Sequence, residues 1–385
     1  MRQGSSMGFL RLAAALGVAA TILLTGCGEF FTPVNNNPPG GGGKSYVYVT
    51  NAGGTLAEYS LSSGALTALS GSPISLPLAP TAIAVAPNNA FLYIGTATGI
   101  FMYIINSDGT LTEGYNDTVV NLNANGYTVA SMAVDPTSSW LLVAYQNQTE
   151  LDAIPISSTT GIPTSAAIVA HSSSATLAPE LIISPDNNFI YLALGTGGTE
   201  AIGFNHTSTS APFASTGQTI KVITNFTSTG VAVDPTSTYL YIAEADTRTN
   251  PVAGNLRMFK VGSLGTELSG SPYATGIGPS AVLADKSGDY VYAANSADGT
   301  ISGFSVDTTS QTLTSLGDPF PTEKSPAALI EDSSKTYVMA VGNGANPNLW
   351  LYSFDATSLG TLDVGSTKST ASVNPSAANG IAVTF

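Results

Sequence analysis

The feature that most constrains this chain is a short pattern that recurs about every fifty residues. Each copy is an apolar stretch that runs into a turn, followed by a second stretch rich in Tyr, Leu and Val. The six copies are Ile83–Pro87, Met132–Pro136, Leu181–Pro185, Val231–Pro235, Val282–Lys286 and Ala328–Asp332. Their last residues lie 49, 49, 50, 51 and 46 positions apart. Repeats of this length, with several strands each, are typical of a β-propeller.

The two ends of the chain predict a seventh repeat that they share. Residues 46–61 resemble the second and third strands of a repeat but lack a first strand, whereas Ile381–Phe385 resembles a first strand alone. An unpaired strand exposes backbone donors and acceptors, so pairing of the two ends removes the last open edge. We therefore predict an all-β, seven-bladed β-propeller of four-stranded antiparallel blades over residues 45–385, closed by the C-terminal strand joining the N-terminal blade.

The first 27 residues indicate export. Arg2 and Arg11 precede an uncharged run, Leu12–Leu24, which is short for a membrane span and typical of a secretory signal. The run ends in Leu-Thr-Gly-Cys, with Cys27 the single cysteine of the chain. This ending resembles the bacterial lipoprotein box, which implies removal of residues 1–26 and lipid attachment to Cys27. The alternative is a plain signal peptide followed by an incidental cysteine.

Residues 27–44 are rich in Gly, Pro and Asn and are predicted to form a flexible tether. With a lipidated Cys27, the propeller is expected to be exported and held at the bacterial cell envelope, because two acyl chains suffice for stable anchoring. Gly28 in place of an aspartate favours the outer membrane if the cell is Gram-negative.

The charge of the chain excludes several classes of partner. There are 11 basic and 25 acidic residues, a net charge of −14, and the signal segment contains two of the basic ones. An acidic surface repels phosphate, so we expect no nucleic acid as a partner. Two histidines and one cysteine also exclude haem and zinc clusters. No cofactor and no metal site are predicted, with Ca²⁺ as a weakly supported possibility, and we expect a monomeric propeller.

The repeats resemble those of YVTN-type and lactonase-type seven-bladed propellers. The resemblance covers residues 45–385 and is carried by strand and turn segments: Tyr46–Asn51, Leu69–Pro73, Leu268–Pro272 and Ser184–Asn187. It implies the fold directly and, by way of members similar to 6-phosphogluconolactonase, a lactone hydrolase.

The residues that carry activity in those enzymes are replaced here. The resemblance implies a Gly-Pro-Arg-His run entering the first strand of the fourth full repeat, where this chain has Thr229-Gly230, and an Asn-Glu pair after its second strand, where it has Glu244-Ala245. In the third repeat, Pro179-Glu180 occupies the place of a histidine. Whether the chain is an enzyme is therefore left open.

A different set of side chains is the candidate site. In a propeller, the loops between blades and those between second and third strands meet at one mouth of the channel. The longest such loop contains Glu244, Asp246 and Arg248, and we expect His171 to lie across an interblade loop. We predict His171 as a base, Arg248 as an anion holder and Glu244 or Asp246 as orienting or cation-binding groups. Glu180, entering a first strand, is a further ligand-binding candidate.

The alternative interpretation of these residues is structural. His171 lies in a serine-rich segment and Arg248 is flanked by acids, which is typical of a solvated side chain and a surface ion pair. The repeated Asp135 and Asp234 are predicted to form turns rather than a site, because an aspartate before proline bonds its own backbone.

Three functions are consistent with the sequence, since the fold alone implies no activity. The favoured one is an envelope-anchored binding module for a protein, a glycan or a small acidic or sugar-derived ligand. The second is a lactone hydrolase with a rearranged site. The third is a cation-dependent structural or adhesive protein that uses its acidic loops.

Overall fold

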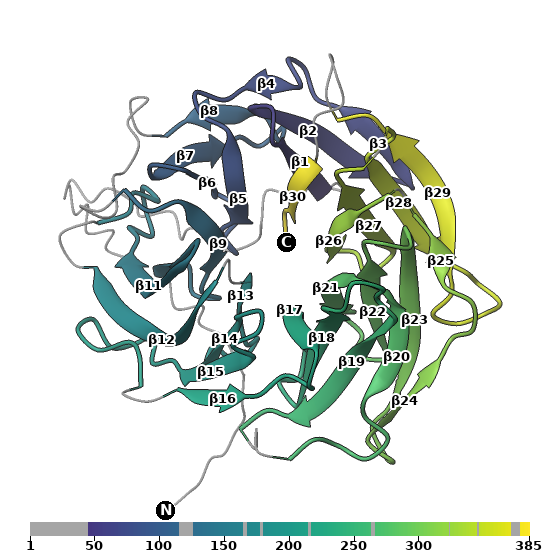
Figure 1. The fold of residues 1–385 in the computed structure, drawn as a ribbon. Helices are drawn as coiled ribbons and strands as arrows, with labels where there is room; N and C mark the ends of the chain where they lie inside the picture. Colours follow the sequence, from purple (N-terminus) through teal and green to yellow (C-terminus); the bar gives the residue numbers. More distant parts are fainter. Residues whose placement is uncertain are drawn as a thin grey trace, which may run out of the picture. The chain divides into compact units, whose positions relative to one another are not determined.

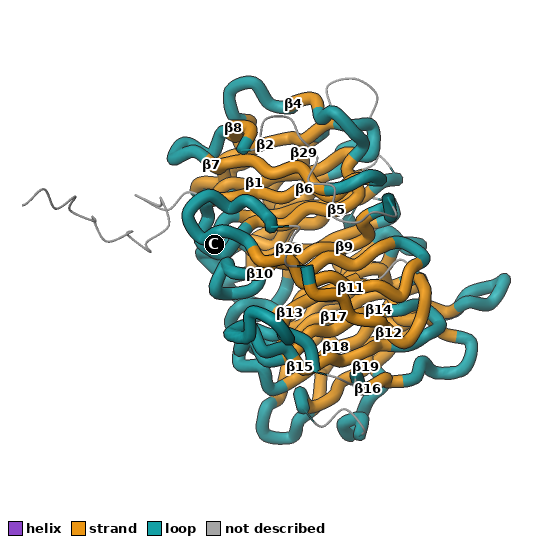
Figure 2. Tube along the Cα trace, turned by 90° about the vertical axis from the view of Figure 1, so that its left-hand side faces the viewer, coloured by secondary structure: helices purple, strands orange, loops and turns teal. Residues whose placement is uncertain are grey.

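The computed structural model describes residues 45–114, 126–164, 168–177, 180–214, 217–262, 266–322, 324–344, 346–370 and 378–385. The predictions for the signal segment, Cys27 and the tether lie outside these residues. Figure 2 shows strands and loops in the described part of the chain. No helix in that part is long and apolar enough to span a membrane.

Seven antiparallel sheets stand around a central axis, each with its first strand innermost (Figure 1). The innermost strands are β5 (Pro80–Val85), β9 (Val129–Val134), β13 (Glu180–Ile183), β17 (Phe226–Val233), β21 (Pro279–Ala284), β26 (Pro326–Glu331) and β30 (Ala378–Val383). The second strands are β6 (Phe91–Thr96), β10 (Trp140–Tyr145), β14 (Phe189–Ala193), β18 (Tyr239–Asp246), β22 (Tyr290–Asn295), β27 (Tyr337–Gly342) and β1 (Ser45–Asn51).

The third strands are β7 (Ile100–Ile105), β11 (Gln148–Pro155), β15 (Thr199–Gly203), β19 (Ala253–Lys260), β23 (Thr300–Asp307), β28 (Leu349–Phe354) and β2 (Thr55–Ser62). The outermost strands are β8 (Leu111–Glu113), β12 (Val169–Leu177), β16 (Gln218–Ile220), β20 (Tyr273–Ile277), β24 (Thr312–Ser315), β29 (Leu362–Lys368) and β3 (Ala65–Ala68). Two short strands, β4 (Ile74–Ser75) and β25 (Phe320–Pro321), add to β2 and β23. The predicted seven-bladed propeller is confirmed.

The shared blade closes the ring as predicted. β30 pairs antiparallel with β1, with Val383 opposite Val47 and Ile381 opposite Val49. Beyond the strand, the Thr384 N–H donates to the carbonyl of Tyr46 at 3.0 Å. Because the first strand of this blade comes from the C-terminus and the other three from the N-terminus, neither end can leave without opening a sheet edge.

The chain end is also held by the neighbouring blade. The side chain of Asn89, in the turn between β5 and β6, accepts from the Phe385 N–H and donates to the Phe385 carbonyl, both at 2.7 Å. The buried side chains of β30 join those of β1 and β27 in one apolar cluster.

The repeated aspartates form turns, as predicted. In the turn after β17, the carboxylate of Asp234 accepts from the N–H groups of Thr236 and Thr238 at 3.0 and 2.6 Å. The same arrangement occurs at Asp135, Asp285 and Asp332. Each of these buried carboxylates satisfies backbone donors that the tight turn would otherwise leave unpaired.

These turns correct the alignment of the sixth repeat. Asp332 is the turn residue there, so its distance from Asp285 is 47 residues rather than the 46 counted from the sequence. The sequence pattern matched Glu331 to the turn position because both side chains are acidic. Glu331 is instead the last residue of β26 and is buried.

Tyrosines of the second strands fix neighbouring blades to one another. The buried hydroxyl groups of Tyr48, Tyr93 and Tyr292 each donate at 2.7 Å to the carbonyl of a glycine in the outer hairpin of the next blade: Gly109, Gly161 and Gly360. These glycines have positive φ, and a Cβ on any of them would lie 2.1–2.4 Å from an aromatic ring of the preceding blade. Only glycine permits both the turn and the close approach.

Candidate functional site

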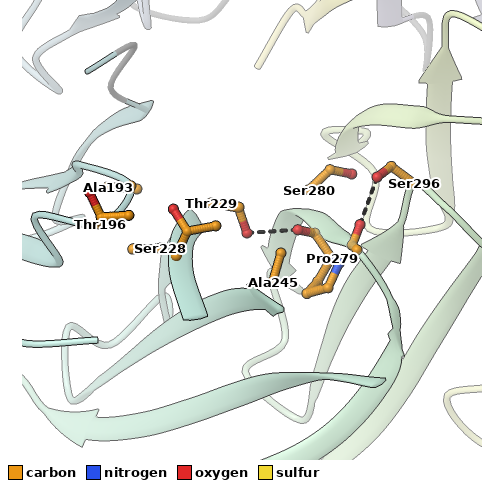
Figure 3. Close-up of a pocket in the computed structure, with 11 residues that line it drawn as sticks. Ala193, Thr196, Ser228, Thr229, Ala245, Pro279, Ser280 and Ser296 are labelled. Atoms are coloured by element: carbon orange, nitrogen blue, oxygen red, sulfur yellow. Dashed lines mark hydrogen bonds between the residues drawn. The ribbon is translucent and has the colours of Figure 1, made fainter. Parts of the chain in front are cut away.

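A pocket of about 490 Å³ lies at the face where the innermost strands begin, here called the upper face. Three consecutive blades form it, through the β14–β15 loop, the starts of β17 and β21, and the ends of β18 and β22. Its polar lining side chains are all hydroxyl groups: Thr196, Thr227, Ser228, Thr229, Ser280 and Ser296 (Figure 3). No charged side chain is among its lining residues.

Strand irregularities place two of these hydroxyl groups. β17 and β21 both contain an extra residue near their starts, Thr229 and Ser280, where the pairing register with the second strand shifts. The Thr229 hydroxyl donates to the carbonyl of Pro279 at 2.7 Å, and the Ser280 hydroxyl donates to that of Pro326 at 2.6 Å. A bulge re-aims a side chain, and here each bulged residue joins its strand to the next blade (Figure 3).

The central channel adjoins this pocket, since Thr229 and Ser280 line both. It has a volume of about 380 Å³ and is lined by residues of all seven innermost strands. Glu180 is the single charged side chain among the described residues that line it.

Glu180 is the one predicted site residue that the structure places at this location. Its Oε2 accepts from the Val231 N–H of the next innermost strand at 3.2 Å. The carboxyl group lies against Gly230, where an added Cβ would be 3.3 Å from Oε2. Burial raises the pKa of Glu180 to about 8, and the hydrogen bond from Val231 only partly offsets this.

His171 lies elsewhere. The sequence placed it in an interblade loop, but it belongs to β12, the outermost strand of its blade, opposite Leu151 of β11. Its ring packs against Phe213 with centroids 5.3 Å apart. The serine-rich segment around it pairs as a strand because alternate side chains of a sheet edge can remain solvated. This position separates His171 from the channel.

Arg248, in the β18–β19 loop, pairs with Asp246, the last residue of β18. Arg248 Nε donates to Asp246 Oδ1 at 2.8 Å, and Asp246 also accepts from the Val252 N–H at 2.8 Å. The hydrogen bonds from Arg248 and from the loop lower the pKa of Asp246. Arg248 lies in the predicted loop but is about half exposed and is not a lining residue of the pocket.

Glu244 belongs to a buried ion-pair network. Its Oε1 accepts from Arg257 Nη1 at 2.8 Å, and Arg257 also binds Glu267 through Nη2 at 2.7 Å. Burial raises the pKa of Glu244, an effect that the Arg257 guanidinium opposes. With 1% of its surface exposed, Glu244 is held by Arg257 rather than presented to a ligand.

Three further buried carboxyl groups have a raised pKa but line neither cavity. Burial raises the pKa of Glu58 and Glu331 to about 7 and that of Asp152 to about 6. Glu58 and Asp152 lie on third strands, and Glu331 lies at the lower end of β26. Among the residues that the structure describes, no three or more His, Cys, Asp or Glu side chains are grouped so that they could hold a metal ion.

The described lining residues of the pocket and channel can be compared with the groups that lactone hydrolysis needs. Ring opening of a lactone needs a group that stabilises the developing oxyanion and a positioned base. The described lining residues of the pocket and channel include no Arg, Lys or His, and their hydroxyl hydrogens are in part donated to backbone carbonyls.

Sequence reasoning missed the hydroxyl residues that build the pocket. The sequence motif identifies Thr229 only as a replacement for an enzyme residue. The sequence does contain a pattern that could have predicted them. The equivalent position near the start of the innermost strand is polar in four blades, at Thr81, Thr229, Ser280 and Asn379.

Comparisons with known proteins agree with the fold. Residues 45–372 match the family model of the lactonase, 7-bladed β-propeller. A comparison with curated proteins gives no significant match.

Solved structures of the same fold include a candidate 6-phosphogluconolactonase from Bacteroides uniformis, with 14% identity, a TM-score of 0.67, and coverage of 88% of this chain and 99% of that one. The periplasmic gluconolactonase of Pseudomonas aeruginosa has 13% identity, a TM-score of 0.65, and coverage of 89% and 99%. A Lactobacillus plantarum protein has 18% identity, a TM-score of 0.65, and the same coverage of 89% and 99%. Because the family model spans nearly the whole described ring, this chain belongs to the lactonase family of seven-bladed β-propellers.

Proposed function

We propose that this protein is a binding module displayed at the bacterial cell envelope, in which the upper-face pocket recognises a small polar ligand or a glycan. The observation that carries the proposal is the lining of that pocket. Thr229 and Ala245, which occupy the positions of the enzyme-type motifs, both line it, and every polar side chain around them is a neutral hydroxyl group. Pockets of this size accommodate small molecules, with a few polar groups that fix orientation.

The proposal is tested with residues 28–385, which include every described strand. A panel of sugars, polyols, amines and soluble glycans is screened by thermal shift and calorimetry, and Ala245→Trp serves to fill the pocket. The matched control is Val252→Trp, because Val252 lies in the hairpin loop that follows the strand of Ala245 and is 48% exposed. We expect a ligand whose binding is lost in the first variant and kept in the second.

The same preparations are assayed for hydrolysis of glucono-δ-lactone and its 6-phosphate. We expect no turnover above the uncatalysed rate, because no cationic side chain lines the described pocket or channel. Turnover that disappears in Ala245→Trp and persists in Val252→Trp would show that the protein is a hydrolase and would refute the binding-module proposal.

Anchoring is the second part of the proposal. The Leu24-Thr25-Gly26-Cys27 sequence supports lipid attachment at Cys27, and the structural relative from Pseudomonas aeruginosa is itself named as periplasmic. Cells fed an alkyne-tagged fatty acid should label the wild-type protein and not Cys27→Ser, which should leave the membrane fraction. Equal labelling of both proteins would refute lipid attachment at this residue.

A further inference from the structure

Much of the wall of the upper channel offers acceptors, because several of its donors already bond the neighbouring blade. The hydroxyl groups of Thr229 and Ser280 and the amide nitrogen of Asn379 donate to the carbonyls of Pro279, Pro326 and Pro80 at 2.6–2.7 Å. The hydroxyl hydrogens of Thr229 and Ser280 and one amide hydrogen of Asn379 therefore bond the neighbouring blade, whereas the oxygens of these side chains keep free lone pairs. Two oxygens of this wall, Thr81 Oγ1 and Asn379 Oδ1, are buried and have no partner among the described residues. The Asn379 oxygen can only accept, and the Thr81 hydroxyl can accept or donate.

Glu180 adds a carboxyl group that the fold does not require. Ser131 occupies the same register position in the preceding blade, opposite Ala144 as Glu180 is opposite Ala193. The Ser131 hydroxyl accepts from the Leu181 N–H at 3.1 Å, and the Glu180 carboxyl makes the equivalent bond to Val231 at 3.2 Å. A short neutral side chain is thus enough to join adjacent innermost strands.

The carboxyl group of Glu180 lacks a counter-charge. No lysine, arginine or histidine is among the described lining residues of the channel or of the pocket. Its Oε1 has no hydrogen-bond partner in the described part of the chain, in contrast to Glu244, which Arg257 neutralises. Glu180 is partly buried, and a carboxylate with reduced access to water is unfavourable unless it is paired. A cationic ligand would supply the missing partner.

We propose that the upper channel and the adjoining pocket bind a small organic ammonium ion that also has hydroxyl groups, with its nitrogen against the Glu180 carboxylate. This inference rests on the proposed function and names its ligand class. An ammonium group has three donors and no acceptor, which complements the oxygens of Glu180, Thr229 and Ser280. The ligand's hydroxyl groups then face the serine and threonine oxygens of the pocket.

Other ligand classes fit this wall less well. An acidic ligand meets Glu180 without any cation to hold it. A neutral polyol donates hydrogen bonds but leaves the carboxylate uncompensated. A divalent metal such as Ca²⁺ takes six to eight oxygen ligands, and no grouping of acidic side chains in the described chain provides such a set.

The test uses three six-carbon probes that differ only at C1: glucamine with an ammonium group, sorbitol with a hydroxyl group and gluconate with a carboxylate. Calorimetry on residues 28–385 at pH 7 should show glucamine binding at least about tenfold more tightly than sorbitol, which corresponds to about 1.4 kcal/mol, and no detectable binding of gluconate. Titrations in two buffers of different ionisation enthalpy should show proton release when glucamine binds, because the ammonium ion favours the ionised form of Glu180.

Two variants assign the effect to Glu180. Glu180→Gln and Glu180→Ser both keep an acceptor for Val231 but remove the charge, and both should bring glucamine to within about twofold of sorbitol and abolish proton release. Glu58→Gln is the matched control, because Glu58 is another carboxyl group with a raised pKa but lines neither cavity. Its glucamine affinity should equal that of the wild type.

The failures of this inference and of the proposed function are distinguishable. Equal affinity for glucamine and sorbitol, or tighter binding of gluconate, would overturn the ammonium inference and leave a binding module with another ligand class. Absence of binding by all three probes would also overturn the ammonium inference. The ligand screen that compares the wild type with Ala245→Trp shows independently whether the pocket binds any ligand. Lactone turnover would refute the proposed function itself.

Discussion

The ring closure makes Val383 a sensitive position, and Val383→Ala should destabilise the propeller by about 2–3 kcal/mol. The side chain is 3% exposed and packs in the cluster that includes Val47, Val49 and Met339. The substitution removes two buried methyl groups, worth about 0.8 kcal/mol each, and the cavity that remains adds to this loss. The neighbouring strands cannot collapse onto the space without losing the register between β30 and β1.

The assay is urea denaturation followed by far-ultraviolet circular dichroism. We expect a lower midpoint with an unchanged slope, since the surface exposed on unfolding stays the same. Val364→Ala is the matched control, because it is the same chemical change at a residue of β29 that is 46% exposed, and it should shift the midpoint little. Equal shifts for the two variants would refute the conclusion that β30 is an integral part of the ring.

Three more predictions follow from the contacts between blades and from the buried charges. Tyr93→Phe should destabilise the protein by about 1–2 kcal/mol because it leaves a buried carbonyl unpaired, whereas Tyr241→Phe, whose hydroxyl has no partner among the described residues, should be neutral in the same denaturation assay. Similar losses for both would contradict a role for the tyrosine hydrogen bond. Arg257→Ala should lower the free energy of unfolding by about 3–5 kcal/mol, because it leaves a buried carboxylate without its cation. Arg248→Ala on the surface should not change the denaturation midpoint. A larger loss of stability for Arg248→Ala than for Arg257→Ala would show that the surface pair matters more. The melting temperature should fall between about pH 5 and pH 8, because Glu58, Asp152, Glu180 and Glu331 have a pKa raised to about 6–8 and keep protons in the folded state that the unfolded chain has already released. A flat or rising profile would refute those shifts.

The candidate site shows where sequence reasoning reached its limit. Glu180 was found from its place at the start of a first strand, because the innermost strands of a propeller always face the channel. His171 and Arg248 were selected for their chemistry, and the structure keeps them apart because one is in an outermost strand and the other folds back on Asp246. Nothing in the local sequence distinguishes an outermost strand rich in serine from a loop.

The sequence alone determined the seven repeats, the order of strands within each blade, the turn role of Asp135 and Asp234, and the joining of both chain ends in one blade. These follow from periodicity and turn chemistry, which are local properties. Tertiary structure alone decided that Arg257 neutralises Glu244, that bulges direct Thr229 and Ser280 toward the next blade, and that no basic side chain of the described residues lines the channel beside Glu180. These partners lie on different strands and blades. Which of them meet depends on the register of the sheets and on the packing between blades, and the sequence of a single strand does not determine either.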